Sequence, residues 1–314
     1  MQVHEPLVAI CTPVYNGGKF IRDALECVQA QTYKNLVHVV SDNASTDDTA
    51  QILEEFQGRR VPLIVSRSPH TVPIMPNWNR VIGLAPPEAK WLRILCADDL
   101  MTPDAVEKMV ALGEANPSVG LVGCGRLLNG TEDNFDWPAV QSIYPGRKAI
   151  RMHFARMGTV YGPHVLVRRD RILDAVKPFD ETMFGADTDM CLRVLRSCDF
   201  AYCHEILAIT REHPATVSAT AMAKRRLHFF DWLIMMDRHG PYAFEPDELA
   251  RLRNLYLRYY RRKMLVWPRE VRAEHRDLLK KHGEKLDSWS FMDAMGNWVL
   301  KRLGLTPGWT GYPF

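Results

Sequence analysis

Residues 8–49 read VAICTPVYNGGKFIRDALECVQAQTYKNLVHVVSDNASTDDT, and this stretch decides the fold. It opens within an apolar run, 7–11, that is typical of a strand buried on both faces. After a Gly-Gly pair, apolar residues recur at helical spacing over 20–28. A second apolar run, 36–40, predicts another strand, and the polar cluster at 41–48 supplies capping residues for a following helix. The stretch therefore predicts strand, helix, strand, helix.

The same alternation continues along the chain. Apolar runs predict strands at 62–65, 91–96 and 119–124. Between them, helices are predicted over 77–85 and from Pro103, a residue tolerated in the first turn of a helix. Strands and helices at this spacing are typical of an α/β fold with a mostly parallel sheet flanked by helices on both faces.

Polar side chains follow three of these strands directly. Thr12 ends the first, Asp42 ends the second, and Asp98 and Asp99 follow the fourth. In open parallel sheets, ligands bind beyond the carboxyl ends of the strands. We therefore expect these residues to converge on one edge of the sheet and to mark a binding site.

The rest of the chain is less regular. Residues 125–165 are rich in Gly, Pro, Asn and Asp and are predicted to form loops, which at this length are often functional. A strand is predicted at 165–167, a helix opening at 185–190, and a strand at 201–210. Near residue 222 the composition changes to long helix-forming stretches, and we expect a boundary there.

Composition and motifs exclude several classes of protein. The 314 residues are 46% hydrophobic and 25% charged, which is ordinary for a globular protein with a large core. Forty basic against 37 acidic residues leave a net charge of +3, so we expect no nucleic-acid partner. The chain carries no GxGxxG after its first strand, no GxxxxGK[ST] and no GxSxG, which disfavours dinucleotide-binding oxidoreductases, P-loop enzymes and α/β-hydrolases.

The cellular setting is predicted from the cysteines and the apolar runs. Seven cysteines without a CxxC pair are interpreted as reduced thiols. No signal peptide is predicted at the N-terminus, and no apolar run approaches the roughly 20 residues of a membrane span. We expect a cytoplasmic protein, or one attached peripherally to the inner membrane face.

Asp98 and Asp99 lie between a buried strand and a helix. Two adjacent carboxylates suit a hard divalent cation such as Mg²⁺ or Mn²⁺, which neutralises the charge of a bound diphosphate. A simpler alternative is that one carboxylate caps the helix at Thr102–Pro103 and the other faces water. The spacing alone leaves both open.

Three other polar segments have two interpretations each. Asp42 can accept a hydrogen bond from a base or ribose, or it can be a turn residue. The segment 187–189, Asp-Thr-Asp, begins a helix, where the N-terminus favours an ionised carboxylate; it suits a general base or a plain N-cap. His213, in Arg-Glu-His-Pro, can bind a metal or be an ordinary surface or core histidine.

Together these motifs resemble glycosyltransferase family 2, a large group of inverting enzymes with the GT-A fold. Residues 8–49 carry its T-P-x-Y-N turn, Q-T-Y segment and D-N-x-S-T-D-D-T cluster. WLRILCADDLMTPDAVEKMV (91–110) is similar to its metal-binding segment, and GADTDMCLRVLR (185–196) to the segment with its catalytic acid pair. REHPATVS (211–218) resembles the element that closes the site.

The resemblance implies a domain organisation and a set of site residues. It implies a GT-A catalytic domain over 1–221, with a nucleotide-binding half (1–124) and an acceptor-binding half (125–221), and a helical region over 222–314. Asp187 is implied as the general base. The implied metal ligands are Asp98, Asp99 and His213. The implied nucleotide-binding residues are Thr12, Pro13, Tyr15, Asn16, Asp42, Asn43, Arg67 and Asp98.

The implied reaction is a single displacement with inversion. A sugar moves from a nucleotide-diphosphate sugar, with UDP-sugar as the expected donor, to a hydroxyl of a glycan or lipid-linked glycan. The implied cofactor is Mn²⁺ or Mg²⁺, and the implied role is surface polysaccharide or glycolipid synthesis.

Two residues depart from the family pattern. The metal motif usually reads Asp-x-Asp-Asp, but its first position here is Cys96, and the acid pair is usually Glu-Asp, but here it is Ala186-Asp187. These departures leave open a catalytically impaired nucleotide-sugar-binding protein that acts as an assembly partner. Asp189 is the alternative base.

The C-terminal region mixes basic and aromatic residues at helical spacing, in RLRNLYLRYYRRKMLVW (251–267) and WSFMDAMGNWVLKRLGL (289–305). We expect these helices to pack on the catalytic domain or to form a homodimer interface. A peripheral contact with anionic lipid is the alternative.

Overall fold

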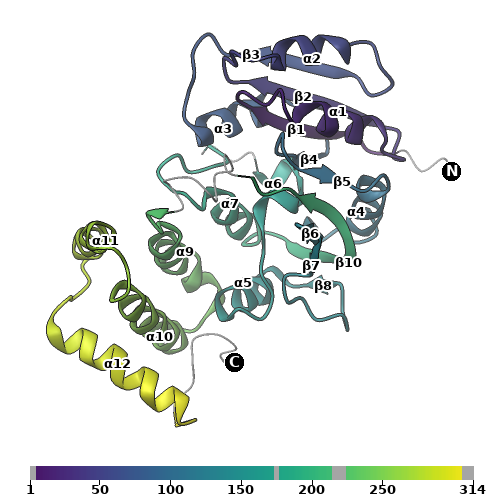
Figure 1. The fold of residues 1–314 in the computed structure, drawn as a ribbon. Coiled ribbons are helices and arrows are strands. Elements are labelled where there is room, and N and C mark those ends of the chain that lie inside the picture. The colour runs from purple at the N-terminus through teal and green to yellow at the C-terminus, as the bar shows by residue number, and fades with distance from the viewer. Residues whose placement is uncertain (1–4, 173–176, 214–223, 306–314) are drawn as a thin grey trace. The chain divides into compact units, whose positions relative to one another are not determined.

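The computed structural model describes residues 5–172, 177–213 and 224–305 (Figure 1). Its contacts divide the chain into two compact units. The first comprises Met1–Ala149, Val160–Thr182 and Ala186–Glu212, and the second Ile150–Thr159, Met183–Gly185 and His213–Phe314. The boundary predicted near residue 222 falls within 214–223, outside the described residues.

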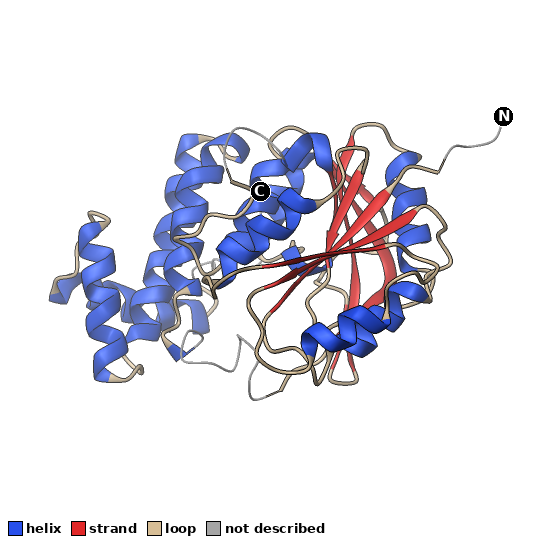
Figure 2. Cartoon of the chain, turned by 90° about the horizontal axis from the view of Figure 1, so that it is seen from above, coloured by secondary structure: helices blue, strands red, loops and turns tan. Residues whose placement is uncertain are grey.

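The first unit is built on one twisted sheet (Figure 2). Its strands are β1 (Val8–Val14), β2 (Leu36–Asp42), β3 (Leu63–Arg67), β4 (Trp91–Ile94), β5 (Leu100–Met101), β6 (Val119–Leu128), β7 (Thr131–Asp133), β8 (Ile143–Tyr144), β9 (Leu166–Arg168) and β10 (Asp199–Thr210). The order across the sheet is β3-β2-β1-β4-β9-β6-β10-β5, with β7 paired to β6 and β8 to β10. The predicted α/β fold is confirmed.

The sheet is parallel in its first part and mixed in its second. β3, β2, β1 and β4 pair in parallel, as the alternation of strands and helices predicts. β9 then lies antiparallel between β4 and β6. The sequence predicts β4, β9 and β6 but not this insertion, because a three-residue strand carries no sign of its direction or its neighbours.

Helices cover both faces of this sheet. They are α1 (Ile21–Gln29), α2 (Thr49–Glu55), α3 (Ile74–Leu84), α4 (Ala105–Glu114), α6 (Arg169–Ile172) and α7 (Ala186–Val194), with a 3₁₀ turn, η1 (Gly162–His164). Val40 of β2 packs in a core with Leu25 of α1 and Leu53 of α2. Its neighbour Ser41 donates a hydrogen bond to Asn77 of α3. Because successive strand residues point to opposite faces, α3 lies on the other side of the sheet.

The loop prediction for residues 125–165 is wrong in part. β6 runs to Leu128, β7 and β8 follow, and a helix, α5 (Gly146–Ala155), lies where only loops are expected. Pro145 and Gly146 at its start favour a turn in the sequence. Further along, Ala149, Ile150 and Phe154 recur at helical spacing and are fully buried.

The predicted helical C-terminal region is confirmed for the described residues. Its helices are α9 (His228–Ala243), α10 (Pro246–Met264), α11 (Arg269–Lys281) and α12 (Ser288–Arg302). α10 begins with Pro246 behind a capping box formed by Glu245 and Glu248. Across the described part of the chain, no helix combines the length and the apolar character that crossing a bilayer requires.

Candidate active site

The carboxyl ends of β1, β2 and β3 meet at one level of the sheet. Val14 pairs with Asp42, and Asp42 pairs with Arg67. The Asp42 side chain is 1% exposed, and its Oδ1 accepts the Ser45 N–H at 2.9 Å. Arg67 Nη1 lies 3.6 Å from Asp42 Oδ2. The structure therefore brings these two predicted residues together as a fixed carboxylate beside a half-exposed guanidinium.

The polar cluster after β2 holds the loop after β1 in place. Backbone N–H groups of residues 16–18 donate to Ser45 Oγ, Thr49 Oγ1 and Asp47 Oδ2. A Cβ on Gly18 would lie 1.6 Å from an Asp48 oxygen, so a larger residue there would have to displace the exposed Asp48 side chain. Several hydroxyls and carboxylates of this cluster thus hold the backbone of residues 16–18 in place instead of binding a ligand.

Tyr15 and Asn16 lie on this fixed loop. The Tyr15 side chain is 53% exposed, which leaves an aromatic face open at the strand-end edge. Asn16 has a φ of 50°, a conformation that asparagine tolerates, and its Oδ1 accepts the Thr46 N–H at 2.8 Å. The structure therefore presents Tyr15 to solvent and uses Asn16 to shape the turn.

Three residues predicted to bind the nucleotide are buried within the protein: Thr12, Pro13 and Asn43. Thr12 is fully buried and shares a hydrogen bond of 2.9 Å with His38 Nε2. Burial lowers the pKa of His38 to about 3, so this pair is neutral. Pro13 lies buried within β1. Asn43 makes two hydrogen bonds, of 2.8 and 2.9 Å, to the Val72 backbone.

Cys96, Asp98 and Asp99 form a cluster in which the ligand atoms all lie within 4.8 Å of one another. Burial, and then the charge of Asp98, raise the pKa of Asp99 to about 7. Burial and the neighbouring carboxylates raise the pKa of the Cys96 thiol well above its usual range. Two carboxylates fit Mg²⁺ or Mn²⁺, whereas a protonated thiol does not. The Asp pair is therefore the part of the cluster that suits the implied metal.

Arg211 directly follows β10 and contacts this Asp pair. The sequence assigned it no individual role. The backbone N–H of Arg211 donates to Asp99 Oδ1 at 3.2 Å, and its side-chain Nε donates to the backbone carbonyl of Asp98. Its Nη1 pairs with Asp23, and its guanidinium lies 5.2 Å from the centre of the Phe20 ring. The one available signal was its place as the first residue of the REHPATVS element.

His213 is placed differently from the Asp pair. It belongs to the second unit and is not among the residues of the carboxylate cluster. The rest of the REHPATVS element, 214–218, lies outside the described residues. A metal contact by His213 therefore stays a prediction.

Asp187 lies in the first turn of α7, against η1. A Cβ on Gly162 would approach the Asp187 Cβ to 2.5 Å, so Gly162 is required for this close packing. Burial raises the pKa of Asp187 to about 6. Asp187 is also close enough to Cys96 to raise the pKa of its thiol, which brings α7 into the electrostatic field of the Asp pair. Asp189, the alternative base, is buried on the same helix.

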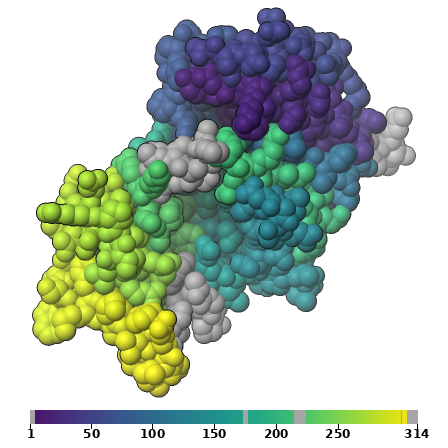
Figure 3. All heavy atoms as spheres, in the orientation of Figure 1, coloured from purple at the N-terminus to yellow at the C-terminus, as the bar shows by residue number. Residues whose placement is uncertain are grey.

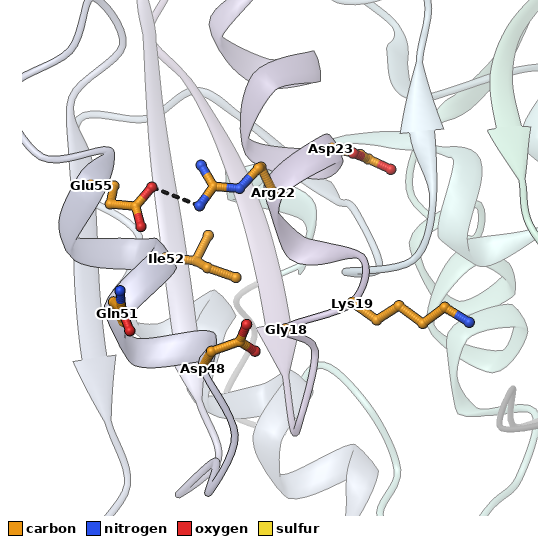
Figure 4. A pocket seen from close by; sticks show the side chains of 8 residues that line it. All are labelled: Gly18, Lys19, Arg22, Asp23, Asp48, Gln51, Ile52 and Glu55. Atoms are coloured by element: carbon orange, nitrogen blue, oxygen red, sulfur yellow. Dashed lines mark hydrogen bonds and ion pairs between the residues drawn. The ribbon is translucent and has the colours of Figure 1, made fainter.

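A separate groove of about 320 Å³ runs between α1 and α2 (Figure 4). Its lining carries both signs of charge, and Arg22 and Glu55 pair across it at 2.6 Å. The lining includes none of the strand-end residues described above. The groove therefore lies beside the candidate site and is not part of it.

Comparison with known proteins shows the family of the chain. The sequence profile of Glycosyl transferase family 2 matches residues 9–173, more than half of the chain. The chain belongs to this family.

Curated relatives of this family 2 glycosyltransferase are distant. An uncharacterized glycosyltransferase of Rickettsia prowazekii is 24% identical over 223 residues, which cover 70% of this chain and 68% of the relative. The chondroitin synthase of Escherichia coli is 28% identical over 212 residues, but these span only 28% of that protein.

Solved structures share the fold at low sequence identity. Staphylococcus aureus TarS (residues 1–349) in complex with UDP-GlcNAc has a TM-score of 0.62 at 15% identity, covering 96% of this chain and 84% of that one. The mannosyltransferase PcManGT of Pyrobaculum calidifontis in complex with GDP-Man and Mn²⁺ has a TM-score of 0.60 at 14% identity, with the same coverage. These likenesses show the GT-A fold.

Replacing Thr12 by Val separates a structural from a nucleotide-binding role for its hydroxyl. We expect Thr12→Val to lower the free energy of unfolding by about 1–3 kcal/mol, because buried His38 Nε2 loses its partner, and to leave UDP affinity unchanged. Thr12→Ser, which keeps the hydroxyl, should lose less. Urea unfolding and calorimetric titration of UDP measure both quantities; a stable Thr12→Val with weakened UDP binding would contradict this assignment.

Proposed function

We propose that this family 2 glycosyltransferase moves a sugar from a UDP-sugar to a hydroxyl of a glycan or lipid-linked glycan, with inversion. The observation that carries the proposal is the placement of the Asp98–Asp99 pair and Asp187 in one electrostatic environment beyond the strand ends. The complexes of TarS with UDP-GlcNAc and of PcManGT with GDP-Man support a nucleotide-sugar donor.

The nucleoside is proposed to bind over the ends of β1, β2 and β3. The exposed ring of Tyr15 can stack on the base. Asp42, held by the Ser45 N–H, can accept a hydrogen bond from the base, and Arg67 can contact the nucleotide from the open side. Asp98 reaches the same nucleotide from the end of β4.

Asp98 and Asp99 are proposed to hold Mn²⁺ or Mg²⁺, with His213 as a further protein ligand. When bound, the metal neutralises charge on the departing nucleoside diphosphate. PcManGT in complex with Mn²⁺ supports a divalent ion. Arg211 keeps the two carboxylates in position by bonding to Asp99 and to the Asp98 backbone.

Asp187 is proposed as the general base. Its carboxylate takes the proton from the acceptor hydroxyl as that oxygen attacks the anomeric carbon, and the bond from this carbon to the diphosphate oxygen breaks. A base works best when its pKa is near the operating pH. Burial raises the pKa of Asp187 to about 6. The residue directly before Asp187 is the fully buried Ala186 in place of the usual Glu, so Asp187 has no adjacent carboxylate on that side.

Asp187→Asn should lower turnover by roughly 10²- to 10⁴-fold, because the amide cannot accept the proton. The rate of UDP release from the most rapidly hydrolysed UDP-sugar, with water as acceptor, measures this without a known acceptor. In the wild type, the same rate should fall as pH drops through about 6, where the carboxylate becomes protonated.

Asp189→Asn is the matched control, because it changes the other buried carboxylate of the same turn. It should keep most of the turnover and the same pH profile, provided that thermal unfolding shows an intact fold. If Asp189→Asn is inactive while Asp187→Asn is active, the two roles are exchanged. Wild-type protein that binds donor without releasing UDP would instead support the impaired, donor-binding alternative.

Asp98→Ala should weaken UDP binding in the presence of Mn²⁺ and abolish the Mn²⁺ dependence of that binding, because one of the two proposed ligands is lost. Calorimetric titration of UDP with and without Mn²⁺ measures the effect. Asp104→Ala, at a half-exposed carboxylate of the same segment outside the cluster, is the control. Equal UDP affinities for wild type and Asp98→Ala with Mn²⁺ would exclude Asp98 as a ligand.

A further inference from the structure

One face of α12 is apolar and exposed. Trp289 is 75% exposed, Met292 60% and Leu303, just past the helix end, 66%. Met295, Val299 and Leu300 are also exposed. These positions recur at intervals of three and four residues, so most of them form one stripe along the helix. Figure 3 shows the α12 segment, in yellow, at the molecular surface.

The opposite face of α12 is anchored to α10. Ala294 is 1% exposed, and Asp293 pairs with Arg258 of α10 at 2.7 Å. The guanidinium of Arg262, also on α10, lies 5.7 Å from the centre of the Trp298 ring. α12 is therefore a docked helix with a defined inner face, and packing among the described residues of this unit does not account for its apolar outer stripe.

The charge around this stripe is positive. Asp293 is the only acidic residue of α12, and Arg258 neutralises it. Arg302 lies at the helix end with its guanidinium 4.3 Å from the Trp298 ring centre, on the same ring as Arg262. Over residues 246–305 the sequence has 14 Lys and Arg against 8 Asp and Glu, whereas the whole chain is nearly balanced at 40 against 37.

This combination favours a lipid surface over a second copy of the chain. In a symmetric dimer the same patch meets itself, so the net positive charge of residues 246–305 would face its own copy. Anionic lipid headgroups complement this charge instead. Trp and Met side chains suit the boundary between headgroups and acyl chains, where an amphipathic helix lies in the plane of the membrane.

We propose that α12 docks on an anionic phospholipid surface. The stripe of Trp289, Met292, Val299 and Leu303 enters the headgroup boundary, and Arg302, at the end of the helix, pairs with a lipid phosphate. This surface is independent of the donor chemistry, so its failure would leave the proposed glycosyl transfer intact.

Co-sedimentation of the full chain with vesicles tests this. Binding to mixed vesicles of phosphatidylcholine and phosphatidylglycerol, whose anionic headgroups give a negative surface potential, should exceed binding to pure phosphatidylcholine and should weaken as salt is raised. Trp289→Glu should lower binding about tenfold, and Arg302→Gln about fivefold on anionic vesicles only. Val140→Glu, at an exposed apolar residue of the first unit, is the control and should bind like the wild type.

Two results would overturn the proposal. One is wild-type protein that stays unbound at low salt. The other is wild-type protein that sediments as a dimer in the ultracentrifuge, is dissociated to monomers by Trp289→Glu, and shows no vesicle binding; this would assign the stripe to a homodimer. UDP affinity should be the same for the wild type and Trp289→Glu, which shows that the variant is folded.

Discussion

Parallel pairing of β1 with β2 on one side and β4 on the other is the constraint on which the site depends. The register aligns Val14 with Asp42 and Cys11 with Ile94, so the segments that leave these strands emerge at the same edge. Tyr15, Asp42 and Asp98, which are far apart in the chain, therefore all follow or end strands at this one edge of the sheet. The loop after β1 is then held by backbone hydrogen bonds to the polar cluster after β2.

The electrostatics of this edge arise because the carboxylates of Asp98 and Asp99 lie close together in a partly buried site. Burial, and then repulsion from Asp98, raise the pKa of Asp99. Arg211 offsets part of this repulsion through its N–H bond to Asp99. A divalent cation would remove the rest, because it favours the ionised form of both carboxylates. The pair is thus organised for a ligand that brings positive charge, and Asp187 lies in the same field without joining the cluster.

Much of the fold could be predicted from residues, because β1, β2, β4 and β6 are buried strands made mostly of apolar residues. The position of β9 could not, since strand order depends on contacts that a three-residue run does not encode. α5 was missed because Pro145 and Gly146 outweighed the apolar spacing after them.

In the site, Asp42 and the Asp pair were predictable from strand ends. Thr12 shows the limit of that argument. It ends the predicted strand, but its side chain lies on the same face of β1 as those of Val8 and Ile10 and therefore meets His38 in the core. Arg211 was missed because its role depends on where β10 lies in the sheet.

The central claim is that this edge binds a nucleotide sugar with a divalent cation. A thermal-unfolding screen against UDP, GDP, UDP-sugars and GDP-Man, each with and without Mn²⁺, tests it most directly. We predict Mn²⁺-dependent stabilisation by one nucleotide family; a compound at about 100 times its dissociation constant should add about 2.7 kcal/mol to the free energy of unfolding. No stabilisation by any of these compounds, with or without Mn²⁺, would contradict the account.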